Sequence, residues 1–93
     1  MTRPLLSDTD RSDVFRGLSH PVRRKVLGLL GKNERSASEL IAGLKLSQPA
    51  LSTHLRVLRD CGLVKQRALG NRRLYSLNPQ ALRKAQQWLG KIV

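Results

Sequence analysis

Polar and cationic side chains gather in two groups between residues 47 and 73. The first group lies on a segment with helical spacing and comprises Ser47, Gln48, Pro49, Ser52, Thr53, His54 and Arg56. The second group flanks a Gly-Asn pair and comprises Arg67, Arg72 and Arg73. Glutamine can pair with adenine through two hydrogen bonds, and arginine can pair with guanine or a phosphate. We interpret the first group as a reader of base edges and the second as a contact to phosphates or a minor groove.

Both groups have a simpler interpretation as solvated surface that binds nothing. Two members of the first group are also ambiguous by themselves. His54 lies next to Leu55 and can either face a ligand or pack inside the domain. Pro49 can touch a thymine methyl group or merely stiffen the start of a helix. The sequence leaves both alternatives open.

The charge balance favours a polyanionic partner. The 93 residues include 18 Lys and Arg against six Asp and Glu, a net charge of +12, and no acidic residue follows Asp60. A basic chain this small fits DNA, RNA or an anionic membrane surface. No apolar run approaches the roughly 20 residues that span a membrane, and the first residues lack the apolar core of a secretion signal. We expect a cytoplasmic protein without membrane insertion.

Two short helices joined by a tight turn would position the first group. Ser36 and Glu39 have the spacing of a capping box and predict where the first of these helices begins. Ser47 predicts the start of the second helix, which ends near Gly62. The apolar residues of the second helix recur every three or four positions and face the core; they are Leu51, Leu55 and Leu58. These signals predict a helix-turn-helix over residues 36–60.

A β-hairpin follows at once and carries the second group. Residues 63–69 and 72–77 alternate imperfectly between apolar and polar types, and the Gly-Asn pair between them is typical of a hairpin tip. A short strand near residues 34–36 can join this hairpin. We expect a wing over residues 63–77.

Two helices precede the helix-turn-helix, after a loose or strand-like lead over residues 1–8. The first covers about 10–18, with Asp10 or Ser12 as its cap. The second covers about 21–30 and begins after His20, which helps to cap it. Its cationic residues are expected to point outward; they are Arg23, Arg24 and Lys25.

A last helix over residues 79–92, capped by Asn78, is expected to form a dimer interface with the first. A domain of this size leaves much apolar surface exposed unless it oligomerises. The apolar residues that we assign to this interface are Val14, Phe15, Leu18, Leu82, Ala85, Trp88, Leu89 and Ile92.

The predicted order is ααααββα, a mainly α winged helix-turn-helix with a β-hairpin wing in one domain over residues 1–93. Three segments in this order resemble the ArsR/SmtB family of bacterial winged-helix repressors; they are FRGLSHPVRRKVL at 15–27, LSQPALSTHLRVL at 46–58 and GLVKQRALGNRRLYSL at 62–77. The resemblance covers about residues 13–90. It implies a homodimer that binds operator DNA and represses transcription, often until an inducer binds.

The chain departs from the metal-sensing members of that family. Those members carry Cys-x-Cys on the third helix, or Asp, His and Glu ligands on the last. Here the third helix contains ELIAGL, and residues 79–92 contain none of those ligand types. The resemblance therefore points to the metal-independent branch, which includes small autorepressors, and we expect no metal or cofactor. The single cysteine, Cys61, excludes an intramolecular disulfide, and we interpret it as a core residue in preference to a redox switch.

The sequence predicts no enzyme, because it has no phosphate-binding glycine loop, no paired carboxylates and no Ser/His/Asp arrangement. We predict a sequence-specific DNA-binding transcriptional regulator, a homodimeric repressor that binds a palindromic operator. One alternative is a winged-helix module that binds RNA or DNA without sequence preference. Another is a protein-interaction module that has lost DNA binding. No motif identifies the operator, the regulated genes, or an inducer or partner protein.

Overall fold

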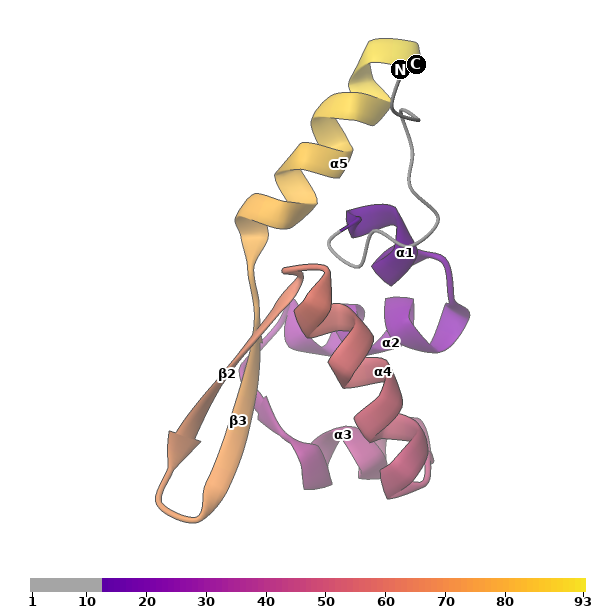
Figure 1. Ribbon diagram of the computed structural model, residues 1–93. Coiled ribbons are helices and arrows are strands. Elements are labelled where there is room, and N and C mark those ends of the chain that lie inside the picture. Colours follow the sequence, from indigo (N-terminus) through magenta and orange to yellow (C-terminus); the bar gives the residue numbers. More distant parts are fainter. Residues whose placement is uncertain (1–12) are drawn as a thin grey trace, which may run out of the picture.

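The computed structural model describes residues 13–93, which form five helices and three strands (Figure 1). In chain order these are α1 (Val14–Leu18), α2 (Pro21–Leu30), β1 (Arg35–Ser36), α3 (Ala37–Leu44), α4 (Gln48–Asp60), β2 (Val64–Leu69), β3 (Arg72–Leu77) and α5 (Pro79–Ile92). This mainly helical fold with an antiparallel hairpin confirms the predicted fold class. The lead that we expected over residues 1–8 lies outside the described residues.

Side chains cap the starts of α2, α3 and α4 where the sequence predicts them. The His20 imidazole accepts an N–H from the first turn of α2 at 3.1 Å. Ser36 and Glu39 each accept the other's backbone N–H, at 3.2 and 3.0 Å, which completes the capping box of α3. Ser47 accepts an N–H from the first turn of α4 at 3.2 Å. These N–H groups have no partner inside the helix, so the caps set where each helix begins.

The predicted cap of the first helix was wrong. The described helix begins at Val14, and the Asp13 carboxylate accepts the N–H of Phe15 at 2.9 Å. Asp13 directly precedes the helix, which is the position from which a short carboxylate reaches the free N–H groups of the first turn. The residues that we had assigned as caps, Asp10 and Ser12, lie outside the described residues.

The start of α5 is tied to the turn that follows α4. Asn78 occupies the predicted cap position, but its side chain makes no capping hydrogen bond. Its amide Nδ2 donates instead to the Gly62 carbonyl at 2.8 Å, and its backbone N–H donates to the Leu63 carbonyl at 2.8 Å. These two bonds fix the point from which α5 leaves the rest of the fold.

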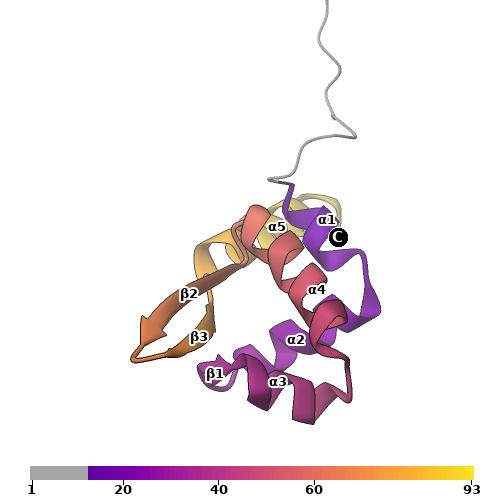
Figure 2. The same ribbon diagram turned by 60° about the horizontal axis from the view of Figure 1, so that its bottom comes forward.

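The sheet has the order β1-β3-β2, with both pairings antiparallel. The short strand expected near residues 34–36 is β1, in which Arg35 pairs with Tyr75. The hairpin closes where Leu69 pairs with Arg72, and Gly70 at its tip has a φ of 63°. Such a left-handed conformation strains residues that have a Cβ, so glycine suits this tip. Figure 2 shows the hairpin projecting to one side of the helices.

One apolar core joins α2, α3, α4 and the base of the hairpin. It includes the three leucines predicted for α4, together with Val26, Leu40 and Leu63, each of which is fully buried. Helix α1 packs closely on this core at Gly17, where an added Cβ would collide with the Leu63 side chain and touch Cys61. Among the described residues, the chain contains no helix that is both long and apolar enough to cross a membrane.

Candidate nucleic-acid interface

Helix α4 presents a polar surface opposite its buried leucines. Ser52, Thr53 and Arg56 are exposed, and with Pro49 they line a shallow depression. The Thr53 hydroxyl donates to the Pro49 carbonyl at 3.1 Å, which leaves its oxygen free to accept a further hydrogen bond. Ser47 lies at the end of this surface, where its hydroxyl oxygen is engaged as the helix cap. The helix therefore offers a row of donors and acceptors with the dimensions of a major-groove reader.

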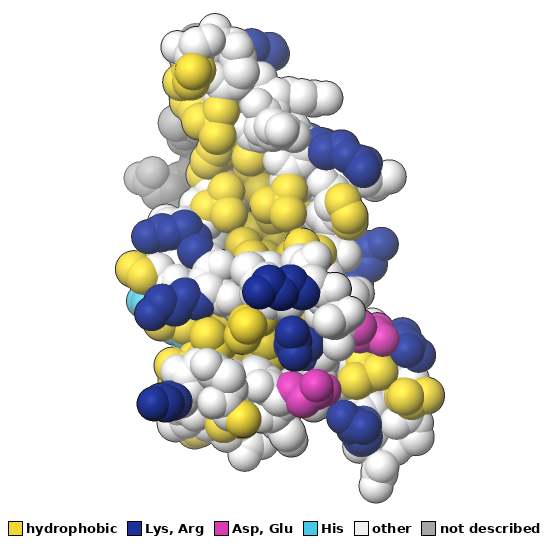
Figure 3. All heavy atoms as spheres, turned by 180° about the vertical axis from the view of Figure 1, so that it is seen from behind, with side chains coloured by type: hydrophobic (Ala, Val, Ile, Leu, Met, Phe, Trp, Pro, Cys, Tyr) yellow, Lys and Arg dark blue, Asp and Glu magenta, His cyan; other side chains and the backbone are white. Residues whose placement is uncertain are grey.

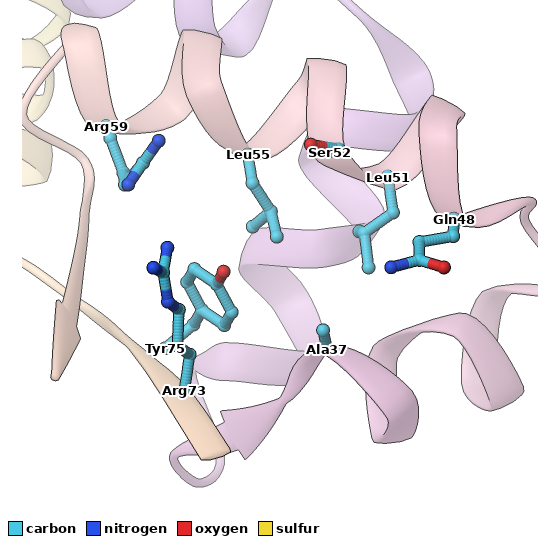
Figure 4. Close-up of a pocket in the computed structure, with 8 residues that line it drawn as sticks. All are labelled: Ala37, Gln48, Leu51, Ser52, Leu55, Arg59, Arg73 and Tyr75. Atoms are coloured by element: carbon cyan, nitrogen blue, oxygen red, sulfur yellow. The ribbon is translucent and has the colours of Figure 1, made fainter. Parts of the chain in front are cut away.

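A pocket lies along α4, between this helix and strand β3 of the wing. Gln48 and Ser52 line it from α4, and Arg73 and Tyr75 line it from β3 (Figure 4). Its volume is about 150 Å³. Gln48 lies at the end of this pocket that is away from Arg73 and Tyr75, near Ala37 and at the border of the polar surface (Figure 4).

Arg59 also lines this pocket, and the sequence analysis missed it. The predicted contacts lie on the side of the helix away from the leucines, and Arg59 lies at the edge of that side. Arg59 follows Gln48 by eleven positions and Ser52 by seven, which places all three on one row of an α-helix. That helical spacing is the feature of the sequence that could have identified Arg59 as a neighbour of Gln48 and Ser52.

His54 lies on the other flank of α4, where it is half-buried and packs against His20 and Arg23; this favours the alternative of packing in the domain. Its ring centroid is 4.5 Å from that of His20, and its Nδ1 is 3.4 Å from Arg23 Nη1. Burial lowers the pKa of His54, and the nearby His20 and Arg23 lower it further. We therefore no longer assign His54 to the DNA-binding surface.

Arg23 does not point outward, contrary to our prediction. Its guanidinium donates to the carbonyls of Gly17 and Arg16, at 3.1 and 2.9 Å, and to the Ser19 hydroxyl at 3.0 Å. Both carbonyls belong to α1, and that of Arg16 also accepts the Ser19 N–H at 3.3 Å and the Ser19 hydroxyl at 2.8 Å. Arg23 therefore links α1, α2 and α4, and its role is structural.

Two of the three wing arginines are held by carboxylates from outside the wing. Arg67 donates two hydrogen bonds to Glu34, both at 2.8 Å, and Arg72 lies 3.7 Å from Glu39. The bonds from Arg67 hold the pKa of Glu34 below its usual value, and the Ser36 backbone N–H does the same for Glu39. The third arginine, Arg73, is in no ion pair among residues 13–93. The wing therefore carries two arginines that a glutamate holds in place and, among the described residues, one that forms no ion pair.

The arrangement of a polar helix beside a cationic hairpin agrees with the family comparison. The sequence model described as "Bacterial regulatory protein, arsR family" matches residues 20–66, which include α4 and the start of the wing. The chain belongs to the arsR family. It is therefore a sequence-specific DNA-binding transcriptional regulator, and the resemblance read from the sequence is confirmed.

Individual members of the arsR family match over most of the chain. The transcriptional repressor SdpR of Bacillus subtilis is 31% identical over 84% of this chain and 87% of its own length. An arsenical resistance operon repressor of Staphylococcus xylosus is 38% identical over 83% of this chain and 74% of its own length. Among solved structures, an ArsR-like transcriptional regulator from Rhodococcus sp. RHA1 superposes with a TM-score of 0.80 at 35% identity, covering 85% of this chain and 72% of that one.

A metal site requires several ligating side chains that lie close together. No cluster of three or more His, Cys, Asp or Glu side chains occurs within residues 13–93. Cys61 is buried, and burial raises the pKa of its thiol although Arg16 and Arg23 lie near enough to oppose that shift. A protonated, buried thiol is a poor metal ligand and a poor nucleophile.

The end of this arsR-family fold formed by α1 and α5 carries an exposed apolar surface, which Figure 3 shows running along α5. Phe15 and Trp88 meet edge to face, with ring centroids 5.3 Å apart, and both remain more than a third exposed. Leu89 and Ile92 continue the surface with exposures of 45% and 65%.

The other residues that we assigned to a dimer interface are used inside the protomer. Ala85 is only 3% exposed, so it cannot form part of an interface surface. Val14, Leu18 and Leu82 are half-buried and pack against the core. Val14 and Leu18 belong to α1, which Gly17 allows to approach Leu63 and Cys61 closely, whereas Leu82 belongs to α5.

Proposed function

We propose that the chain acts as a homodimeric repressor that binds a palindromic operator. Two copies join through the apolar surface of α1 and α5, which we define as Phe15, Trp88, Leu89 and Ile92. The observation that carries this proposal is the separation of surfaces within one chain. Exposed polar and cationic side chains lie on α4 and the wing. Exposed apolar side chains lie along α5 (Figure 3), and Figure 1 shows α5 at the other end of the molecule from the wing.

In this proposal α4 enters the major groove and the wing reaches towards the adjacent minor groove. Gln48, Ser52, Thr53 and Arg56 contact base edges or nearby phosphates, while Ser47 and Pro49 fix the start of the helix. Arg72 and Arg73 contribute phosphate contacts, with Arg67 positioned by Glu34. A two-fold axis through the dimer would place two α4 helices about 34 Å apart, one turn of DNA.

The remaining assignments follow from this role. We propose that the protein catalyses no reaction and works in the cytoplasm, where its operator lies. Regulation is independent of metal ions, because the residues carry no recognisable ligand set for zinc, cadmium or arsenite. Its DNA affinity should therefore be the same with and without each of these ions.

Selection of duplexes from a random pool, followed by sedimentation of the purified complex, tests the proposal. We expect enrichment of an inverted repeat with half-site centres about 10 base pairs apart, bound by two chains. Enrichment of a single half-site bound by one chain would contradict the dimer. A pool that remains random would favour the alternative of binding without sequence preference.

A further inference from the structure

The pocket between α4 and the wing is lined by two arginines from different elements. Arg59 comes from the last turns of α4 and Arg73 from β3, and their guanidinium groups point toward one another (Figure 4). Tyr75 carries its hydroxyl into the same space, and Gln48 and Ser52 add an amide and a hydroxyl. Every polar side chain here can donate a hydrogen bond.

The pocket is strongly cationic. Within residues 13–93, no carboxylate lines it, and neither Arg59 nor Arg73 belongs to an ion pair. The neighbouring arginines of the wing behave differently, since Arg67 and Arg72 each lie beside a glutamate. Two like charges that face each other without a counter-ion repel, and an anion placed between them removes that repulsion.

The position of the pocket identifies the anion. A sugar-phosphate strand separates the major groove from the adjacent minor groove. A protein that places a helix in one groove and a hairpin toward the next must span that strand at the point between them. Arg59 and Arg73 occupy that point, since one belongs to the helix and the other to the hairpin.

We propose that Arg59 and Arg73, with the Tyr75 hydroxyl, form a seat for one backbone phosphodiester of the bound DNA. The seat rests on the proposed placement of α4 and the wing. Guanidinium groups suit it because their planar donors match phosphate oxygens two at a time. The seat fixes the position of α4 relative to the wing on the duplex, and thereby the register in which Ser52 and Gln48, further towards the start of α4, meet the bases.

The test replaces each arginine by glutamine and each backbone phosphate of the duplex by an uncharged methylphosphonate. The duplex is the one enriched by selection, and an exposed arginine on α5, Arg83, supplies the matched control through Arg83→Gln. We expect the wild-type protein to lose about tenfold or more in affinity when one particular phosphate of each half-site is neutralised. Arg59→Gln and Arg73→Gln should weaken binding to the unmodified duplex by a similar factor, and should no longer respond to that neutralisation.

Three outcomes would overturn the seat. In the first, both variants bind the unmodified duplex as the wild type does. In the second, they bind it weakly, yet neutralisation of each phosphate weakens their binding as much as it weakens that of the wild type. Alternatively, inorganic phosphate alone shifts the Arg59 and Arg73 resonances while both variants bind DNA normally, which would assign the pocket to a free anion. Circular dichroism and thermal unfolding confirm that each variant is folded.

A failure of the proposed sequence specificity is distinguishable from a failure of the seat. If selection enriches no duplex, random-sequence DNA still tests the seat, because a phosphate contact does not depend on sequence. The slope of log K against log salt should then flatten by about one unit in Arg59→Gln, and by clearly less in the Arg83→Gln control, which removes a charge far from the seat. Equal slopes in the two variants would contradict the seat.

Discussion

The end of the molecule formed by α3, α4 and the wing differs from the α1–α5 end in how its exposed side chains are held. At the first end, contacts between elements orient the cations, as when Glu34 binds Arg67 and Glu39 lies beside Arg72. At the second end, Trp88 and Leu89 are about half exposed, and the protomer offers them little to pack against. Oriented polar groups suit a ligand that must be read in one register. An apolar surface suits burial against another apolar surface.

The comparison predicts that changes at one end leave the function of the other end intact within the protomer. Burial energy should dominate at the α1–α5 end, and hydrogen bonds and charge should dominate at α4 and the wing. Substitutions at each end therefore test this division, and the largest effect is expected at the α1–α5 end.

Leu89→Asp should dissociate the dimer. The substitution would bury an unpaired carboxylate in each half of the interface, at a cost of about 3–5 kcal/mol and hence more than a hundredfold in Kd. Sedimentation equilibrium measures the change. Gln87→Asp adds the same charge on the opposite side of α5 by helical spacing and should leave the dimer intact. A wild-type chain that sediments as a monomer at micromolar concentration would remove the basis for this prediction.

Gln48→Ala should relax base preference at one or two positions of each half-site. The expected loss of discrimination is about 1–3 kcal/mol if Gln48 bonds a base through both amide groups. Binding isotherms on the selected duplex and its single-base variants measure it, with Gln86→Ala on α5 as the control. If neither Gln48→Ala nor Arg56→Ala alters base preference, the DNA contacts a different side of α4.

Arg72→Ala should weaken binding to the selected duplex and to scrambled DNA by similar factors. Arg72 adjoins the hairpin tip and is proposed to contact a phosphate, which carries no sequence information. The slope of log K against log salt should flatten by about one unit. Titrations at several salt concentrations measure the slope, and a loss confined to the selected duplex would show that Arg72 reads bases.

Acid should destabilise the α4 end through His54. Burial holds the pKa of His54 in the folded chain below that of an unfolded chain, so the unfolded chain binds the proton more readily. Stability should therefore be intact above about pH 6.5, the usual pKa of histidine, and should fall as the pH drops through the lowered folded value. Denaturant unfolding between pH 8 and pH 5 measures this, and His54→Gln should flatten the dependence. An unchanged slope in that variant would show that other groups cause it.

Glu34→Gln should have a small effect of opposite sign to Arg72→Ala. Removal of the carboxylate frees Arg67 for phosphate contacts, so affinity for scrambled DNA should rise and the salt slope should steepen by up to about one unit. Asp60→Asn removes another exposed negative charge, one that belongs to no ion pair within residues 13–93, and serves as the control. Equal effects of the two substitutions would mean that only net charge matters, with no specific release of Arg67.

The elements of this fold were predictable because their signals are local. The caps Ser36 and Ser47 bond N–H groups three residues away, and the leucines of α4 recur at the helical period. The Gly-Asn hairpin tip likewise depends on the turn alone. The sequence also supplied the set of candidate DNA contacts on α4, since residues opposite a buried stripe of a helix are exposed wherever that helix packs.

Tertiary structure decided which of those side chains remain available. Arg67 bonds Glu34 across 33 positions, and Arg59 and Arg73 line one pocket only because the hairpin folds back beside α4. Arg23 and His54 pack against each other across 31 positions, and Ala85 is buried within the protomer. Periodicity determines the side of an element on which a residue lies. The angles at which helices and strands dock determine what that side faces, and those angles arise from the packing of the whole core.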